Sequence, residues 1–269
     1  MRASPGPEGA PTPQAPLVVA VHGWMLSGRL WDPLRPYLDP PWSLWCPDLP
    51  GFGECPRPRD LQPSLASYGR WLAAAAQRQA RGRSIVLMGH SLGGSVALHA
   101  APLLGSQLVA MVQIGSGGGV YQPRPFARLR RGGAAFLQLR PRWLVGSWAA
   151  ESPWRGPLMA ETRAARGLLA TSTHRGAVRQ LPMLTATLTV PSLWIVGERD
   201  RVMEPRYVRH LASFAPDHRL ELISKGGHLP MCEQPEVLAA LLMDWFEAIG
   251  LTPDPGVEPL GLAGAARWA

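Results

Sequence analysis

The chain contains few cysteines and almost no lysine. Its three cysteines, Cys46, Cys55 and Cys232, are odd in number and widely spaced, so they predict no disulfide framework and favour a reducing compartment, the cytoplasm. The sequence also has no Cys-x-x-Cys pair and no Cys/His spacing typical of zinc ligands. We therefore expect neither a metal ion nor another cofactor.

Long unbroken apolar runs are missing as well. Residues 91–123 carry no formal charge, but Pro102 and the glycine run Gly117–Gly119 interrupt them. A membrane-spanning helix needs about 20 predominantly apolar residues, so we expect no transmembrane segment. Residues 1–16 are rich in Pro, Gly and Ala and lack the apolar core of a signal peptide. Residues 252–269 have a similar composition, and we expect both ends to be flexible.

Acidic residues are scarce in one segment, where basic charge accumulates. The chain carries a net charge of +8, and residues 115–185 alone hold eleven arginines against two glutamates. Nucleotide bias would explain why Lys225 is the single lysine, but it does not explain the clustering. Aromatic stacking platforms and groove-reading motifs are lacking, so we do not expect nucleic-acid binding. The segment is expected to attract a different anionic partner.

Short apolar runs alternate with helical patterns along most of the chain. The predicted strands are residues 17–21, 43–46, 84–88, 108–114, 192–196 and 219–224. The predicted helices are residues 31–38, 64–80, 91–104, 204–214 and 235–249. This alternation predicts an α/β fold with a mostly parallel central sheet and helices on both faces. Residues 115–185 break the rhythm with helical patches and no clear strand, so we expect an insertion between the two core segments, 17–114 and 186–251, that covers one edge of the sheet.

The stretch MGHSLGG, residues 88–94, contains the pattern Gly-x-Ser-x-Gly between a predicted strand and a predicted helix. Gly89 and Gly93 would remove side-chain clashes at a sharp strand-to-helix turn. Ser91 would then lie at a helix N-terminus, where free N–H groups favour developing negative charge. The pattern is short enough to occur by chance. A catalytic serine also needs a base and an orienting group, so the pattern is evidence for catalysis only if the sequence supplies both.

Two further residues are candidates for those roles. His228 follows the last predicted strand, and Asp200 follows the strand before it. Both would emerge at the carboxyl ends of parallel strands, the edge where Ser91 lies and where such sheets place their sites. Glu198 is an alternative to Asp200 two residues away, and the six other histidines are more often structural than catalytic.

Acyl transfer also requires N–H donors aimed at the oxyanion of the tetrahedral intermediate. The N–H of Leu92, directly after the serine, is one candidate. The turn HGW after the first strand offers another through the Trp24 N–H. The indole of Trp24 has a simpler interpretation as a packing aromatic, and the two roles are compatible.

Taken together, the motifs HGW (22–24), DLPGFG (48–53), GHSLGG (89–94), GERD (197–200) and GGHLP (226–230) resemble the successive signatures of the α/β-hydrolase fold superfamily. Within it, the chain is most similar to the pimeloyl-acyl-carrier-protein methyl ester carboxylesterases, which act in biotin synthesis. The resemblance implies that Ser91 is the nucleophile, His228 the base and Asp200 its orienting group. It also implies that Trp24 and Leu92 supply the oxyanion donors.

The resemblance further implies that residues 115–185 form the cap and that an acidic acyl carrier protein docks on it. Arg124, Arg128 and Arg131 recur at helical spacing, so they are candidate docking residues on one face. A solvated cationic face without a partner, or contact with anionic lipid, is an alternative. The apolar residues of the cap line an acyl pocket or form its own core. They are Phe126, Leu129, Phe136, Leu137, Leu139, Trp143, Leu144, Trp148, Leu158, Met159, Leu168 and Leu169.

These observations predict a serine carboxylic ester hydrolase that acts through an acyl-enzyme. Alternatives with the same three residues are an esterase or lipase for another small acyl substrate, a C–C hydrolase or a lyase. A non-catalytic ligand sensor with a hydrolase fold is a further alternative. The complete set of serine, histidine and aspartate argues against the sensor, which has no need to retain all three.

Overall fold

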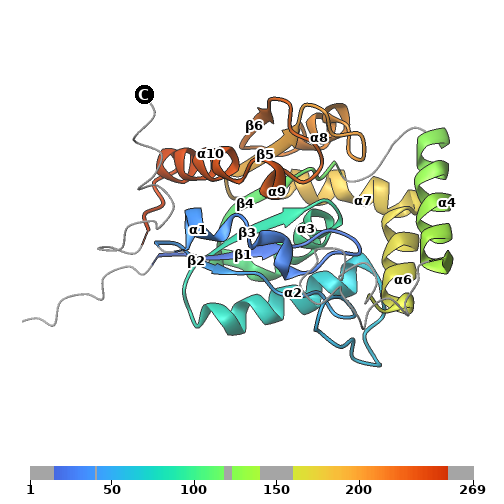
Figure 1. Ribbon diagram of the computed structural model, residues 1–269. Coiled ribbons are helices and arrows are strands. Elements are labelled where there is room, and N and C mark those ends of the chain that lie inside the picture. The colour runs from blue at the N-terminus through green and yellow to red at the C-terminus, as the bar shows by residue number, and fades with distance from the viewer. Residues whose placement is uncertain (1–14, 40, 118–122, 140–159, 254–269) are drawn as a thin grey trace, which may run out of the picture.

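The computed structural model describes residues 15–39, 41–117, 123–139 and 160–253 (Figure 1). Apart from two residues each, the predicted leader and the predicted tail lie outside the described residues. So does part of the predicted cap, including Trp143, Leu144, Trp148, Leu158 and Met159. The side chains of residues 123–129 also lie outside the description.

Six parallel strands form a single sheet in the order β2-β1-β3-β4-β5-β6. They are β1 (Leu17–Val21), β2 (Ser43–Trp45), β3 (Ile85–His90), β4 (Leu108–Ile114), β5 (Ser192–Gly197) and β6 (His218–Ile223). Every residue of β1, β3 and β5 is buried, as expected for strands that are covered on both faces. The predicted α/β fold with a mostly parallel sheet is confirmed.

Helices cover both faces of this sheet (Figure 1). The helices α2 (Leu65–Ala80), α3 (Leu92–Leu104) and α8 (Pro205–Ala212) contribute to one apolar core, and α1 (Arg35–Leu38) and α10 (Pro235–Ala248) contribute to the other. Three short elements join the longer ones: η1 (Gly28–Trp31), η2 (Gly105–Gln107) and α9 (Pro230–Glu233). In the described ranges, no helix is long and apolar enough to cross a membrane.

Three described helices lie between β4 and β5 in the sequence: α4 (Pro123–Leu139), α6 (Thr162–Ser172) and α7 (Arg175–Ala186). They stand at one end of the molecule (Figure 1), where α6 contacts the turns that follow β1 and β2. Leu137, Leu168 and Leu169 are buried, in keeping with a cap core. Phe136 and Leu139 are 44% and 80% exposed, so they are not part of a buried cap core in the described residues. The helical period explains this, because Leu137 occupies the inner face of α4 and its neighbours point away.

Candidate active site

Ser91 occupies a sharp, strained turn between β3 and α3. Its φ is +53° and its ψ is −121°, a conformation that costs a non-glycine residue about 1–3 kcal/mol. The backbone is crowded here, because a Cβ on Gly89 would lie 2.5 Å from the Gly94 Cα. The Ser91 N–H donates to the Ile114 carbonyl at 2.9 Å. The turn is therefore held by the sheet and permitted by glycine.

The strand before this turn is longer than the sequence predicts. Gly89 and His90 still pair with Gln113 and Ile114 of β4, so β3 continues to the residue before Ser91. The apolar run ends at Met88, but backbone pairing does not depend on side-chain hydropathy. The serine is consequently placed directly at the end of a central strand.

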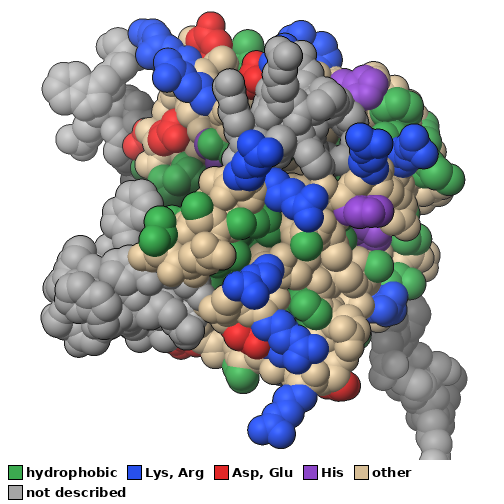
Figure 2. Space-filling model, turned by 90° about the vertical axis from the view of Figure 1, so that its right-hand side faces the viewer, with side chains coloured by type: hydrophobic (Ala, Val, Ile, Leu, Met, Phe, Trp, Pro, Cys, Tyr) green, Lys and Arg blue, Asp and Glu red, His purple; other side chains and the backbone are tan. Residues whose placement is uncertain are grey.

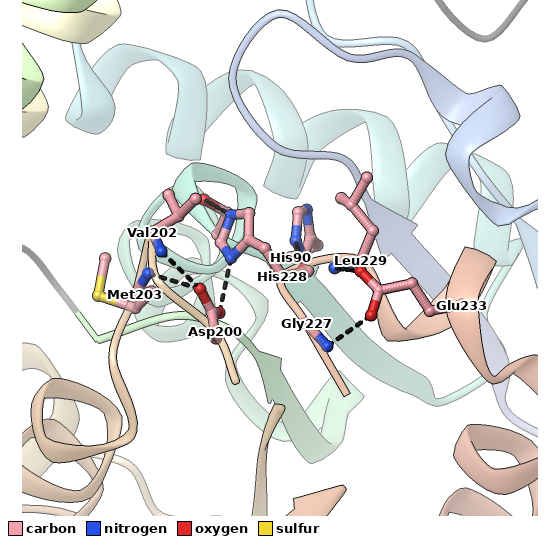
Figure 3. Close-up of polar contacts among 9 residues, drawn as sticks. His90, Asp200, Val202, Met203, Gly227, His228, Leu229 and Glu233 are labelled. Atoms are coloured by element: carbon pink, nitrogen blue, oxygen red, sulfur yellow. Dashed lines mark hydrogen bonds and ion pairs between the residues drawn. The ribbon is translucent and has the colours of Figure 1, made fainter. Parts of the chain in front are cut away.

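The structure brings Ser91, His228 and Asp200 into one chain of hydrogen bonds. The Ser91 Oγ lies 3.2 Å from the His228 Nε2, and the His228 Nδ1 lies 2.7 Å from the Asp200 Oδ2. Asp200 is buried, and its Oδ1 accepts the N–H groups of Val202 and Met203, each at 2.8 Å (Figure 3). These two bonds fix the carboxylate, so its other oxygen is held against the imidazole.

Glu198, the alternative acid, is engaged elsewhere. Its side chain is exposed and accepts the Lys225 N–H at 2.9 Å and the Ser224 hydroxyl at 3.4 Å. It thus holds the turn after β6, whereas Asp200 meets the imidazole. Two carboxylates of one loop therefore have separate positions, and Asp200 is the one that faces His228.

Two residues that the sequence analysis did not single out hold the backbone of His228 (Figure 3). The Glu233 carboxylate accepts the Gly227 N–H at 2.5 Å and the Leu229 N–H at 3.0 Å, on either side of the histidine. The His90 Nε2 lies 2.8 Å from the His228 carbonyl, which can only accept, so His90 donates. In the sequence, the contacts of Glu233 are indicated only by the position of this glutamate five residues after His228. No sequence pattern indicates the contact of His90.

The two candidate oxyanion donors flank the serine. The Leu92 N–H belongs to the first residue of α3, where no preceding helical turn supplies a carbonyl acceptor. Trp24 lies in a turn closed by the Leu26 N–H and the Gly23 carbonyl at 3.2 Å. That turn adjoins the serine, because a Cβ on Gly23 would come 3.2 Å from the Ser91 Cβ. Both predicted donors therefore belong to segments that adjoin the turn at Ser91.

His22 precedes this turn and connects it to the loop after β2. Its Nδ1 lies 2.8 Å from the Gly23 carbonyl, and its Nε2 accepts the Leu49 N–H at 3.0 Å. The side chain is fully buried, and this burial lowers its pKa. A neutral ring with one donor and one acceptor satisfies both contacts. The histidine of the HGW motif is thus structural.

Buried histidines make the stability of the fold depend on pH. Burial is the main cause that lowers the pKa of His22 and of His99, and it holds the pKa of His90 well below its usual range. Below about pH 6.5 the unfolded chain therefore binds more protons than the folded one, so the free energy of unfolding falls as the pH falls. Each such histidine contributes up to about 1.4 kcal/mol per pH unit.

We expect the variant His90→Gln to flatten this dependence. Urea unfolding between pH 5.5 and 7.5 should give a smaller slope than the wild type, whatever the change in absolute stability. His210→Gln is the control, since His210 is exposed. A wild-type slope in the His90 variant would show that His90 titrates alike in the folded and unfolded chain.

The candidate docking arginines share the helix α4, but only part of their arrangement is described. Arg131 is exposed, while the side chains of Arg124 and Arg128 lie outside the described residues. Basic side chains outnumber acidic ones on the face that carries α4 and α6 (Figure 2). Other exposed arginines of α4, α6 and α7 are Arg130, Arg163, Arg166, Arg175 and Arg179. Among the described residues, no cluster of three or more His, Cys, Asp or Glu side chains could hold a metal ion.

Relatives of known name match nearly the whole chain. The pimeloyl-[acyl-carrier protein] methyl ester esterase of Stenotrophomonas maltophilia (strain K279a) is 30% identical over 262 residues, covering 88% of this chain and 95% of that protein. The protein of the same name from Xanthomonas campestris pv. campestris (strain B100) is 32% identical over 261 residues, covering 87% of this chain and 96% of that protein.

Solved structures share the fold at lower identity. A thermophilic esterase from Thermogutta terrifontis superposes with a TM-score of 0.69 at 24% identity and covers 90% of this chain and 92% of its own. MenH from S. aureus gives a TM-score of 0.71 at 19% identity, with 89% and 96% covered. Residues 18–241 match the Alpha/beta hydrolase family. Together with the parallel-sheet fold and the strained turn at Ser91, this match shows that the chain belongs to the alpha/beta hydrolase family.

Proposed function

We propose that this protein hydrolyses a carboxylic ester through an acyl-enzyme formed on Ser91. The observation that carries the proposal is the hydrogen-bonded series from Ser91 through His228 to the buried Asp200. A serine hydroxyl is a weak nucleophile at neutral pH and needs such a base and orienting group. All three lie at the carboxyl end of the parallel sheet, where ligands of such folds bind.

The reaction follows from these positions. The His228 Nε2 takes the proton of the Ser91 hydroxyl as its Oγ attacks the ester carbonyl, and Asp200 stabilises the imidazolium. The same proton then passes to the leaving alkoxide, which departs as the alcohol and leaves the acyl group on Ser91. Water, activated by His228, attacks the acyl-enzyme and releases the carboxylic acid. The N–H groups of Trp24 and Leu92 donate hydrogen bonds to the carbonyl oxygen, which carries a negative charge in both steps.

The substrate we propose is a methyl ester of an acyl chain carried by an acidic acyl carrier protein, as in biotin synthesis. The names of the two esterase relatives support a pimeloyl chain. The exposed arginines of the cap support an acidic macromolecular partner, because opposite charge speeds encounter and orients docking. Arg131 of α4, with Arg124 and Arg128 on the same helix, is the proposed docking group.

Salt dependence tests this substrate. We expect the methyl ester of a pimeloyl group on acyl carrier protein to be cleaved with a kcat/KM at least about tenfold above that of free dimethyl pimelate at low ionic strength. The advantage should shrink as salt rises to 0.5 M, about where charges more than a few Å apart are screened. Equal kcat/KM values for both substrates at every salt concentration would show that the enzyme does not recognise the carrier protein.

Charge reversal at one site tests the docking face. Arg131→Glu is expected to lower kcat/KM for the carrier-bound ester about 3- to 30-fold at low salt and to leave the free ester unchanged. Arg78→Glu is the matched control, since Arg78 is also exposed and the substitution changes the net charge equally. It lies near the far end of α2, away from the cap. If both variants lose the same activity, net charge rather than a docking face governs the encounter.

The contacts of Glu233 predict an effect on the chemical step. Glu233→Ala frees the two N–H groups that bracket His228, and we expect kcat for a simple ester to fall about 10- to 100-fold because the imidazole is misplaced. Glu233→Gln keeps one acceptor oxygen and should lose less. Glu236→Ala removes a carboxylate that accepts the Tyr37 hydroxyl instead and should keep wild-type kcat. Wild-type kcat in Glu233→Ala would show that the strand end alone orients His228.

A further inference from the structure

The turn of residues 23–26 lies against Ser91 and its neighbour His90 on its inner side. A Cβ on Gly23 would come 2.8 Å from the His90 Nδ1 and 3.2 Å from the Ser91 Cβ. Met25, within the turn, has a φ of +65°, which non-glycine residues adopt rarely and only when surrounding contacts impose it. The proposed Trp24 donor therefore belongs to a closely packed turn, and contacts with the surrounding residues maintain the unusual backbone conformation of that turn.

The outer side of this turn is bound by the cap. The Trp24 indole N–H donates to the Ala165 carbonyl of α6 at 2.9 Å. A Cβ on Gly133 of α4 would lie 3.1 Å from the Trp24 Cη2 and 2.9 Å from the Leu169 Cδ2. The indole thus reaches from the turn to two cap helices, and the absence of a side chain at Gly133 makes room for it.

The start of α6 is itself fixed to the core of the fold. Arg57 forms a two-bond ion pair with Glu161 at 2.7 and 3.1 Å, and the Arg57 side chain is only 5% exposed. The Glu161 N–H donates to the Gly51 carbonyl at 2.6 Å. Ala165 follows one helical turn later. The carbonyl that accepts the Trp24 indole N–H therefore lies one helical turn from this fixed start of α6.

We infer that Trp24 is a positioning residue that couples the cap to the oxyanion hole. Its side chain is held by α4 and α6, and its backbone N–H is the proposed oxyanion donor, so the cap helices set the direction of that donor. This inference rests on the proposed function. It implies that groups bound under the cap change the rate of the chemical step, because a donor misplaced by about 1 Å costs up to about 100-fold.

Two adjacent glycines of α4 provide a matched test. Gly133→Ala places a methyl group against the Trp24 ring, whereas Gly132→Ala places it where nothing lies within 4 Å. Both changes bring the same gain in helix propensity. With p-nitrophenyl butyrate we expect Gly133→Ala to lower kcat at least about tenfold with KM within about twofold. Gly132→Ala should keep both parameters within about twofold of wild type.

A second variant addresses the indole itself. Trp24→Phe keeps the backbone N–H and an aromatic ring but removes the bond to Ala165, so kcat should again fall more than KM changes. Combined with Gly133→Ala it should lose less than the product of the single effects, since both act through one contact. Thermal unfolding of each variant verifies folding, and Trp24→Phe decides alone if Gly133→Ala does not fold.

The outcomes separate the coupling from the function on which it rests. Wild-type kcat in the folded variants, or a change in KM alone as expected of a mere pocket wall, overturns the coupling, provided that the wild-type protein hydrolyses the ester and Ser91→Ala does not. If the wild-type protein and Ser91→Ala are equally inactive, the proposed function fails and the coupling fails with it.

Discussion

Replacing Ser91 by alanine is expected to lower kcat for ester hydrolysis by about 10⁶-fold, to the level that binding and the oxyanion donors sustain alone. The change removes one oxygen from the strained turn and deletes the nucleophile, so no acyl-enzyme forms. His228 then has no hydroxyl within reach of its Nε2, which lies 3.2 Å from the serine oxygen in the wild type. Steady-state hydrolysis of a p-nitrophenyl ester gives the rate.

A fluorophosphonate probe shows which serine reacts. The wild-type protein should be labelled at Ser91, and the Ser91→Ala variant should not be labelled. Ser95→Ala is a matched control, because Ser95 lies one turn further along α3 and is buried away from the imidazole. Equal labelling of wild type and Ser91→Ala would exclude Ser91 as the nucleophile.

The second large effect is expected from Asp200→Asn, which should lower kcat by about 10³- to 10⁴-fold at neutral pH. Asparagine has the same shape, and its Oδ1 can still accept the Val202 and Met203 N–H groups. Its amide N–H₂ would then face the His228 Nδ1 in place of a carboxylate oxygen. That arrangement favours the imidazole tautomer with the proton on Nε2, which cannot take the serine proton.

Comparison with Glu198 tests the assignment of the acid. Glu198→Gln weakens contacts to the turn at Ser224 and Lys225 and should change kcat less than about tenfold. Circular dichroism and thermal unfolding establish that both variants are folded. The opposite order, with Glu198→Gln inactive and Asp200→Asn active, would transfer the orienting role to Glu198.

Local signals were strong enough to predict most elements of the core. Buried apolar runs marked the strands at 17–21 and 108–114, and both have those bounds in the structure. The predicted helix 64–80 begins with a serine, a residue type that favours helix N-termini, and the Ser64 hydroxyl accepts the Ser67 N–H at the start of α2. These features depend on neighbours in the sequence, so hydropathy and capping chemistry suffice to find them. The end of β3 was missed because backbone pairing, not hydropathy, sets it.

The cap was the part that sequence patterns described least well. An apolar residue in a helix is predicted to be buried, yet Leu139 is 80% exposed while Leu137 of the same helix is buried. Which face of α4 turns inward depends on the elements it meets, and those are far away in the sequence. Trp24 and Ala165, 141 positions apart, form one such contact.

The sequence by itself determined the α/β fold, the serine at a strand-to-helix turn and the chain order of serine, aspartate and histidine. These depend on periodicity, on glycine at a crowded turn and on the rule that parallel strands end at one edge of a sheet. Only the tertiary structure decided that Glu198 binds the turn after β6, that Glu233 and His90 hold the His228 backbone, and that Trp24 contacts α6. Each of these is a contact between segments brought together by folding, and a hydrogen bond a few Å long leaves no periodic trace in the sequence.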